Sequence, residues 1–485
     1  MACGICALLT PAARIVARRF GLVDRPDGRR KIHENAVPVA GGLAIFLAAS
    51  SAVAIAVIAN NPFRSQLRDE FASLLGLLLA AITICLVGVA DDFWGLRGRH
   101  KLAGQLVAAL CIVASGHVVR TIRLFDLQLD LGLLAVPFTI FWILGAINSL
   151  NLIDGMDGLS SCIGLIVSVS LAIMAAISEQ WAAACIAVAL AGALLGFLIY
   201  NLPPASIFLG DAGSMLIGLV VGVLAIQGSL KAPATIALAA PLAAMAIPIM
   251  DTLAAIIRRK LTGRSIYSAD RGHLHHCLLR SGLTPQRALF WVVLFCLATC
   301  GGALASLAFN NELYAVLTAF AVVGTLIITR LFGFAEFLLV KERLLATGAS
   351  FLHRNGHATP HQTSIRLQGS ADWKDLWERL LNCAVQLQLK AIHLDVNAPN
   401  IHEGYHARWD CVEDPSDPDL WRAEIPLVAN GQHVGRLQIV GQRNHVPVWT
   451  SITALAHSLE DLDEAVSAVA YAPHISLNTH ATTTT

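Results

Sequence analysis

The 485 residues are 56% hydrophobic and only 14% charged, with a mean hydropathy of +0.64. Soluble globular proteins carry roughly 25% charged residues, so this composition excludes an ordinary soluble protein and predicts one that crosses a membrane several times. The formal net charge of +1 and the near-neutral isoelectric point argue against a nucleic-acid-binding protein, which usually presents a basic face.

Ten apolar stretches approach the roughly 20 residues that a membrane-spanning helix needs. In chain order they cover residues 37–59, 71–90, 102–118, 131–147, 159–177, 181–199, 214–227, 233–257, 288–309 and 314–334. The apolar run at residues 1–10 is too short to span, so any eleventh helix is expected in truncated form. We therefore predict an all-α polytopic membrane domain over residues 1–348, with about ten to eleven transmembrane helices.

The loops between these stretches fall into two sets, because successive spans alternate sides of the membrane. One set consists of the loops at residues 20–38, 91–101, 148–158, 200–213 and 258–287. As a group these loops carry most of the loop arginines and lysines. The positive-inside rule places this basic set in the cytoplasm. The polar motifs described below lie in the same set. We expect a multi-pass membrane protein with its active site on the cytoplasmic side.

From about Ala349 the sequence takes on a soluble character. Residues 373–389 repeat apolar side chains at helical spacing, residues 391–396 and 435–440 have the pattern of strands, and residues 449–469 predict a second helix. We predict a small cytoplasmic α+β accessory domain over residues 349–472. A disordered tail is expected over residues 473–485.

Two acidic residues, Asp91 and Asp92, stand side by side at the end of the second apolar stretch. Adjacent carboxylates repel each other, so the pair is costly unless a metal ion, a lysine or a proton offsets the charge. Lys101 follows before the next stretch. A solvated helix end explains an isolated Asp-Asp equally well, so this motif alone does not define a site.

The most specific polar segment covers residues 148–159, between the fourth and fifth apolar stretches. Two amides and two carboxylates recur there at three-residue steps, namely Asn148, Asn151, Asp154 and Asp157. Acidic groups at the edge of the hydrocarbon layer need burial in protein, a partner or a water-filled cavity. Two Asp-Gly steps permit tight turns that bring these side chains to one cavity. An ordinary turn between spans is the alternative, although such a turn rarely carries four polar side chains.

The loop at residues 200–213 contains Asn201, Phe208 and Asp211. Asp211 stands between two glycines, where a ligand can approach the backbone closely. A hard oxygen ligand at this place suits Mg²⁺ held together with substrate phosphates. Phe208 could stack on a planar base, although taken alone it is better explained as a core aromatic residue.

Three histidines, His273, His275 and His276, follow Arg271 in the most basic loop. Tetrahedral zinc needs a fourth donor, and no cysteine or carboxylate stands at a familiar zinc spacing. We therefore favour contact of these donors with phosphate oxygens, where they would stabilise charge that develops during transfer. A solvated basic loop is the alternative.

Together the motifs predict a metal-assisted reaction on a phosphorylated substrate at one face of a membrane. An ion-coupled membrane transporter is the alternative from another class, because transporters also place acids within the bilayer. The acids here gather at one end of the helices, whereas transporter sites lie near the midplane. A third hypothesis makes the chain a membrane-anchored signalling module that acts through its C-terminal domain.

The ordered motifs resemble those of the polyprenyl-phosphate N-acetylhexosamine-1-phosphate transferases, glycosyltransferase family 4. The resemblance covers about residues 9–334 and rests on residues 23–33, 38–42, 91–92, 148–159, 201–213, 251 and 273–276. It implies Mg²⁺-dependent transfer of a sugar-1-phosphate from a UDP-sugar to polyprenyl (undecaprenyl) phosphate with release of UMP, the first membrane step of cell-envelope polysaccharide synthesis. Mn²⁺ is an alternative metal.

The form of the histidine motif and His33 favour the N-acetylglucosamine branch, so UDP-GlcNAc is the expected donor. A UDP-MurNAc-pentapeptide phosphotransferase is the alternative within the family. The expected partners are the UDP-sugar, the lipid phosphate and the membrane, with no nucleic acid, and a homodimer is left open. The soluble domain after Ala349 lies outside the family pattern.

The resemblance also implies roles for individual residues. Asp211 would ligate Mg²⁺, and Asp91 or Asp92 would deprotonate the lipid phosphate. The other residues implied are Asp154 and Lys101 in the catalytic set, Asp157, Asn201 and Phe208 in a uridine pocket, and Asn148, Asn151, Lys31, His33, Arg271, His273, His275 and His276 in substrate binding. We expect direct attack of the lipid phosphate on the sugar-bearing phosphorus, with a covalent aspartyl intermediate as the alternative.

Overall fold

The computed structural model describes residues 1–24, 36–125, 127–230, 236–237, 239–261, 272–341, 344, 361–368, 373–398, 403–412, 417–429 and 432–443. The chain divides into two compact units. Met1–Ala254 and His273–Phe332 form the helical unit, and Ala255–Gly272 and Gly333–Thr485 form the second unit. The predicted domain boundaries after residues 348 and 472 stay predictions.

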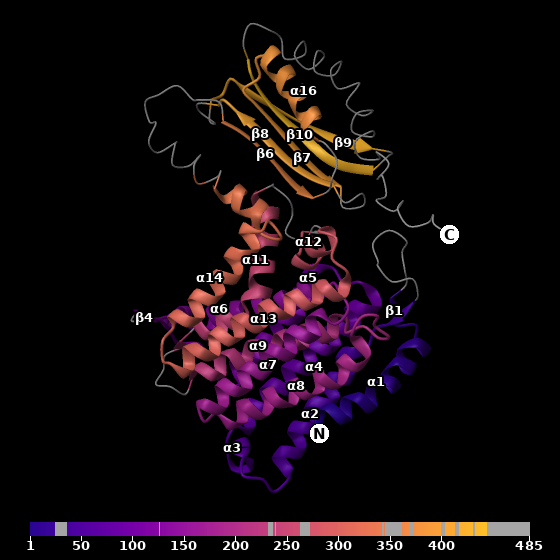
Figure 1. Cartoon of the computed structure of the whole chain (residues 1–485), viewed down its shortest axis with the longest axis vertical. Helices are drawn as coiled ribbons and strands as arrows, with labels where there is room; N and C mark the ends of the chain where they lie inside the picture. Colours follow the sequence, from indigo (N-terminus) through magenta and orange to yellow (C-terminus); the bar gives the residue numbers. More distant parts are fainter. Residues whose placement is uncertain are drawn as a thin grey trace, which may run out of the picture. The chain divides into compact units, whose positions relative to one another are not determined.

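Helices, most of them apolar, make up most of the first unit (Figure 1). Their bounds are α1 Ala2–Arg19, α2 Gly41–Ile58, α3 Arg64–Asp69, α4 Phe71–Trp94, α5 Gly98–Ala114, α6 Ala135–Ile153, α7 Leu159–Ile177, α8 Trp181–Asn201, α9 Gly210–Leu230, α10 Ala239–Ala244, α11 Ala246–Leu261, α12 Leu274–Arg280, α13 Pro285–Ala308 and α14 Leu313–Ile328. The part of α11 from Ala255 onward belongs to the second unit. Local signals fix several ends. Gly95 ends α4 in the left-handed conformation, and the Thr284 side chain caps α13 by accepting from the backbone N–H of Arg287.

Short strands connect some of these helices. β1 (Val23–Asp24) pairs with β2 (Val37–Pro38) in antiparallel fashion. β3 (Thr121–Leu124) lies between β4 (Leu127–Asp130) and β5 (Ile236–Ala237), and a 3₁₀ turn follows at Gly132–Leu134.

Seven helices in the described part of the chain are long and apolar enough to cross a membrane. They cover Gly41–Ile58, Phe71–Trp94, Gly132–Ile153, Leu159–Ile177, Trp181–Asn201, Gly210–Gln227 and Pro285–Ala308. The chain is therefore a multi-pass membrane protein, but the predicted ten to eleven spans are not confirmed. The stretch predicted at 233–257 is divided between α10 and α11, and α5 and α14 are 17 and 16 residues long.

The first helix corrects one expectation. α1 continues through Pro11 to Arg19, so it is an 18-residue helix and is not limited to the apolar run at residues 1–10. It packs against α2 and α8. The hydroxyl of Tyr200 on α8 donates to the carbonyl of Ala7 at 3.0 Å. The buried residues of α1 run from Ala2 to Ala17, so the part beyond the apolar run also packs in the unit.

Helix α9 is the most enclosed of the seven candidate spans, with 83% of its window buried. It packs against α2, α4, α6 and α7. Small residues permit close contact between helices. A Cβ atom on Gly88 of α4 would lie 2.3 Å from the Cα of Ala212, so the two backbones touch at this point. This contact brings the acidic end of α4 beside the start of α9.

The second unit contains a five-stranded antiparallel sheet in the order β6-β8-β7-β10-β9 (Figure 1). Its elements are β6 His361–Gln368, α16 Trp373–Gln386, β7 Ala391–Ala398, β8 Glu403–Asp410, β9 Leu420–Ala429 and β10 Gln432–Gln442. α16 packs on β7 and β8 with Trp373 and Trp377 fully buried.

The predicted helix at 373–389 and the two predicted strands are confirmed, as α16, β7 and β10. β6, β8 and β9 were not predicted. The predicted helix at 449–469 and the tail at 473–485 lie outside the described residues.

Candidate active site

A lysine joins the ends of three helices in the first unit. Lys101, in the first turn of α5, places its Nζ 2.8 Å from Asp91 Oδ2 and 2.7 Å from Asp211 Oδ2. Asp91 belongs to the last turn of α4, and Asp211 to the first turn of α9. The structure therefore brings together three residues from two of the predicted loops, 91–101 and 200–213. The Asp211 side chain is 32% exposed, against 11% for Asp91, so Asp211 is the more accessible carboxylate.

Asp92 has a different environment from its neighbour. Its Oδ1 accepts a hydrogen bond from the backbone N–H of Asp211 at 3.0 Å, and its Oδ2 from that of Ala212 at 3.5 Å. The first N–H groups of a helix have no partner within the helix, and they carry partial positive charge. A Cβ atom on Gly210, whose φ is +75°, would lie 2.7 Å from Asp92 Oδ2. Asp92 therefore holds the start of α9 in place.

The polar segment at 148–159 contributes to this cluster only in part. Asn151 donates from Nδ2 to Asp211 Oδ1 at 2.7 Å and to Ser214 Oγ at 3.0 Å. Asn148 instead exchanges hydrogen bonds with the amide of Gln105 on α5, at 2.9 and 3.3 Å. Asn151 thus orients the Asp211 carboxylate, whereas Asn148 joins α6 to α5.

Excess negative charge marks the centre of the cluster. Asp154 follows α6, and burial together with repulsion from Asp211, Asp92 and Asp157 raises its pKa well above the usual range. Lys101 compensates part of this charge, through its ion pairs with Asp91 and Asp211. A divalent cation would relieve the repulsion that remains, because it favours the ionised form of each carboxylate.

The donor set fits Mg²⁺. Within the described residues no three His, Cys, Asp or Glu side chains form a ready-made metal site. Mg²⁺ does not require one, because proteins commonly hold it with one or two carboxylates and substrate phosphates. The oxygens of Asp211 already accept from Lys101 and Asn151, but each carboxylate oxygen has a further lone pair.

Asp157, Asn201 and Phe208 shape the loop between α8 and α9. Asp157 Oδ2 accepts from the backbone N–H of Ala205 at 2.9 Å. The buried Asn201 accepts from Ser161 Oγ at 2.9 Å and donates to the Ile207 carbonyl at 3.0 Å. These contacts hold the loop from both sides.

The segment at residues 38–42 lies against the end of the same loop. Phe208 donates from its backbone N–H to the Pro38 carbonyl at 2.8 Å, and its own carbonyl accepts from Gly41 at 3.0 Å. A Cβ atom on Gly42 would lie 2.3 Å from the backbone nitrogen of Gly213. Glycine at this position lets the segment touch the first turn of α9, beside Asp211.

A buried acid, Asp251 on α11, positions the histidine segment. Its Oδ2 lies 2.7 Å from His273 Nδ1, and its Oδ1 accepts from the backbone N–H of Leu274 at 2.7 Å. Asp251 is fully buried. Asp251 is part of the family resemblance but not of the predicted site, although an acid within an apolar stretch is a visible signal.

Among the described residues the ring of His275 has no hydrogen-bond partner at either nitrogen, and His275 is 1% exposed. Its ring centroid lies 6.1 Å from that of His273 and 4.2 Å from that of His276. Burial and these two histidines lower the pKa of His275 well below its usual value. His275 is therefore a neutral imidazole beside the polar segment. Lys31, His33 and Arg271 lie outside the described residues.

The neutral state of His275 predicts a pH dependence of stability. Below about pH 6.5 the unfolded chain takes up a proton at this histidine, but the folded chain does not. The contribution of His275 to the free energy of unfolding should therefore be fully present above pH 6.5. It should decrease below that pH, by at most about 1.4 kcal/mol per pH unit. Denaturant unfolding of wild type and His275→Gln between pH 5 and 8 measures this. Parallel curves for the two proteins would exclude the buried neutral state.

The contact between the polar segment and His275 gives a second prediction. A Cβ atom on Gly155 would lie 2.3 Å from His275 Nε2, so Gly155→Ala should displace the ring. We expect a loss of about 1–3 kcal/mol in stability, measured by denaturant unfolding. Gly145→Ala on α6 is the matched control, because a Cβ atom there meets nothing within 4 Å. Equal stability of the two variants would mean that the ring moves without cost.

The family model and the curated relatives that match this chain are described in similar terms. The sequence model of the family described as glycosyl transferase family 4 matches residues 74–229. A protein of Bacillus subtilis described as a probable undecaprenyl-phosphate N-acetylglucosaminyl 1-phosphate transferase is 32% identical over 289 residues, 59% of this chain and 78% of the relative.

Two further relatives are described in similar terms. A decaprenyl-phosphate N-acetylglucosaminephosphotransferase of Mycolicibacterium smegmatis is 34% identical, covering 65% of this chain and 83% of the relative. An undecaprenyl-phosphate alpha-N-acetylglucosaminyl 1-phosphate transferase of Salmonella typhi is 32% identical, covering 58% of this chain and 76% of the relative. The family-model match at residues 74–229 and the cluster around Lys101 lie in the same helical unit.

Proposed function

Because the chain belongs to glycosyl transferase family 4, in its polyprenyl-phosphate N-acetylglucosamine-1-phosphate transferase branch, we propose that it transfers GlcNAc-1-phosphate from UDP-GlcNAc to a polyprenyl phosphate. The reaction releases UMP. The observation that carries the proposal is the contact of Lys101 with both Asp91 and Asp211, with Asn151 on the other Asp211 oxygen. Acids, amide and cation meet there at the ends of apolar helices, where a lipid phosphate and a soluble nucleotide can both arrive.

The residues of the cluster have different roles in the proposed reaction. Asp91, held by Lys101, accepts the proton of the lipid phosphate, and a lipid phosphate oxygen attacks the sugar-bearing phosphorus. A new P–O bond forms there, and the bond to the UMP phosphate breaks. Asp211 and Asp154 would hold Mg²⁺, which supplies positive charge to the diphosphate when it is bound. Asp92 keeps the start of α9, and with it Asp211, in position.

The histidine segment supports phosphate binding in this proposal. Asp251 holds His273 by its Nδ1, and His275 lies next to Gly155 of the polar segment. A neutral imidazole can donate one hydrogen bond to a phosphate oxygen without bringing a second cation near Lys101. Asp157, Asn201 and Phe208 would form the uridine side of the site, because they fix the loop that ends at Asp211.

We place this site on the cytoplasmic face of the bacterial inner membrane, in a bundle of ten to eleven spans. The support is the excess of arginine and lysine in the loops on that side. A transporter is not favoured, because the carboxylates lie at helix ends: Asp91 in the last turn of α4 and Asp211 in the first turn of α9.

Release of UMP by the purified full-length chain tests the proposal. With undecaprenyl phosphate as the acceptor, we expect UMP from UDP-GlcNAc and none from UDP-MurNAc-pentapeptide. Chelation of divalent ions should stop the release, and added Mg²⁺ or Mn²⁺ should restore it. Release that is unchanged by chelation would remove the metal from the mechanism. No release with any UDP-sugar would overturn the transferase proposal.

A further inference from the structure

Gly272, the residue before the histidine segment (residues 273–276), lies against a buried arginine. A Cβ atom on Gly272 would overlap the guanidinium of Arg258, so only glycine lets the two lie this close. Arg258 is 2% exposed and belongs to α11, the helix whose Asp251 contacts His273 Nδ1 at 2.7 Å. Positions 251 and 258 are seven residues apart, almost two helical turns, so both side chains leave the same face of α11. One face of this helix therefore contacts two consecutive residues, Gly272 and His273.

Another residue of the second unit, Glu336, holds the Arg258 guanidinium in this position. Glu336 lies in the helical residues 334–341 that follow α14, and its carboxylate forms an ion pair with Arg258 Nη1. The Arg258 and Glu336 side chains are only 3% and 9% exposed, so their attraction is little screened by water and salt. A guanidinium is planar and donates in fixed directions, so a carboxylate on one edge also sets its orientation. The ion pair therefore keeps the guanidinium against Gly272.

Apolar contacts fix the two helical segments that carry this ion pair. Leu339, three residues after Glu336, forms a buried cluster with Ile365 of β6. Leu261 of α11, three residues after Arg258, packs against the same cluster. Residues three apart are neighbours on a helix surface, so the cluster lies next to the ion pair. The sheet of the second unit thus helps to hold Glu336 in place, although the transferase resemblance ends at about residue 334.

We propose that Glu336 is a positioning residue of the transferase reaction, which holds Arg258 against Gly272 and so fixes the histidine segment for the phosphates of the donor. The inference rests on the proposed function, because that function supplies the phosphates. The proposed base and metal ligands belong to the first unit, whereas Glu336 belongs to the second. The second unit therefore takes part in donor binding through its buried ion pair. Small displacements of a binding group are costly, because a hydrogen bond weakens steeply when its geometry is disturbed.

Steady-state release of UMP by the full-length chain gives the first test. Glu336→Gln keeps the size of the side chain and removes the charge that holds Arg258. We expect the KM for UDP-GlcNAc to rise about tenfold, with a smaller change in kcat, the usual effect of one weakened hydrogen bond to a charged group. The KM for undecaprenyl phosphate should stay at the wild-type value. Arg258→Lys should have the same effect, because an ammonium lacks the planar donor edge of the guanidinium.

Amide hydrogen exchange of the full-length chain gives a second test that needs no substrate. In both variants the amides of α12 should exchange at least about tenfold faster, because the residue that precedes the histidine segment is no longer held. Those of α13 should exchange as in wild type. The double variant should match the single variants, because all three lose the same ion pair. Arg258→Lys keeps the positive charge, and it replaces Glu336→Gln in both tests if that variant does not fold.

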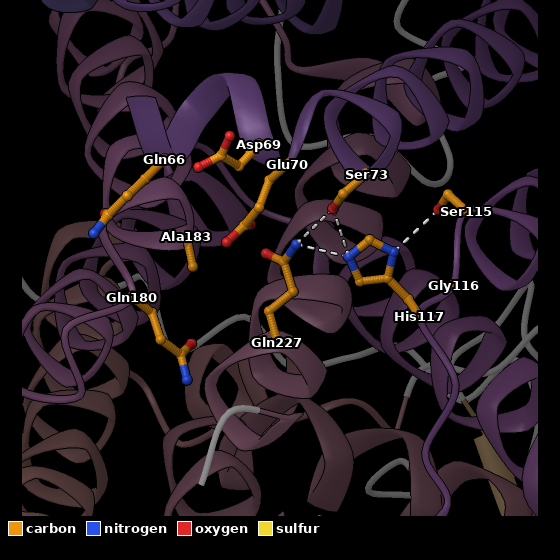
Figure 2. A pocket seen from close by; sticks show the side chains of 10 residues that line it. All are labelled: Gln66, Asp69, Glu70, Ser73, Ser115, Gly116, His117, Gln180, Ala183 and Gln227. Atoms are coloured by element: carbon orange, nitrogen blue, oxygen red, sulfur yellow. Dashed lines mark hydrogen bonds between the residues drawn. The ribbon is translucent and has the colours of Figure 1, made fainter. Parts of the chain in front are cut away.

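Two control variants disturb polar contacts away from the histidine segment. Gln227→Met removes a contact of 2.7 Å with His117, near the end of α9 opposite Asp211 (Figure 2). Arg408→Lys disturbs the ion pair of Arg408 with Asp410 within the sheet of the second unit. We expect wild-type KM values and wild-type exchange of α12 from both variants.

Three results would overturn the proposal: wild-type exchange of α12 in Glu336→Gln, faster exchange in every helix, or equal rises in both KM values. The last two would indicate a general loss of structure. If wild type releases no UMP from any UDP-sugar, the proposed function fails instead, and the exchange of α12 still decides whether Glu336 holds the segment.

Discussion

Asp211→Asn is expected to abolish Mg²⁺-dependent release of UMP, a loss of at least about 10³-fold. The substitution keeps the size of the side chain but removes the charge that faces Lys101 Nζ at 2.7 Å and that would hold the metal. The initial rate of UMP release at saturating UDP-GlcNAc measures the loss. Raising the Mg²⁺ concentration should not restore the rate, because the amide lacks the charge that holds the ion.

Two comparisons make this result specific. Asp130→Asn removes an exposed carboxylate from β4, and we expect wild-type rates from it. Unfolding midpoints of both variants distinguish lost chemistry from lost structure. A wild-type rate for Asp211→Asn would remove Asp211 from the proposed metal ligands and leave Asp154 alone in that role.

Lys101→Met should reduce activity by about 10²- to 10³-fold and lower the free energy of unfolding by up to about 3 kcal/mol. The lysine is 17% exposed and contacts Asp91 and Asp211, so its removal leaves two neighbouring carboxylates with less compensation. Lys101→Arg should restore little, because a planar guanidinium does not reproduce a single Nζ placed between two oxygens. UMP release and denaturant unfolding measure the two effects.

Added Mg²⁺ gives this prediction a distinctive readout. If repulsion between carboxylates causes the instability, millimolar Mg²⁺ should stabilise Lys101→Met more than it stabilises wild type. Lys341→Met, at an exposed position in the second unit, is the control and should be neutral. An equal effect of Mg²⁺ on all three proteins would show that Lys101 does not compensate the acids.

The sequence alone predicted a mostly helical, multi-pass membrane protein, because hydropathy determines it, but the predicted number of spans is not confirmed. The predicted cytoplasmic face of the polar loops stays a prediction. The sequence could not predict individual contacts. Asn148 and Asn151 have the same side chain at a three-residue spacing, yet one pairs with Gln105 and the other with Asp211. That difference depends on how α5 and α9 pack, which a local pattern does not contain.

Other errors also have local causes. β9 contains Pro426, which disfavours a strand prediction, but β9 is at the edge of the sheet, where proline is tolerated. The sequence predicts one span over the apolar stretch at 233–257, but the structure has two helices there: α10 ends at Ala244 and α11 begins at Ala246. Asp251 lies on α11, after that interruption, and contacts His273.

Gly88 and Ala212 touch through their backbones, so side-chain motion cannot easily change the distance between Asp92 and Asp211. Where two helices touch without intervening side chains, they tilt in the bilayer as one body. Asp92 and Asp211 lie within one turn of that contact. A change in bilayer thickness, which re-tilts helices, should therefore move both carboxylates together, and the geometry of the site is insulated from the lipid composition of the membrane around it.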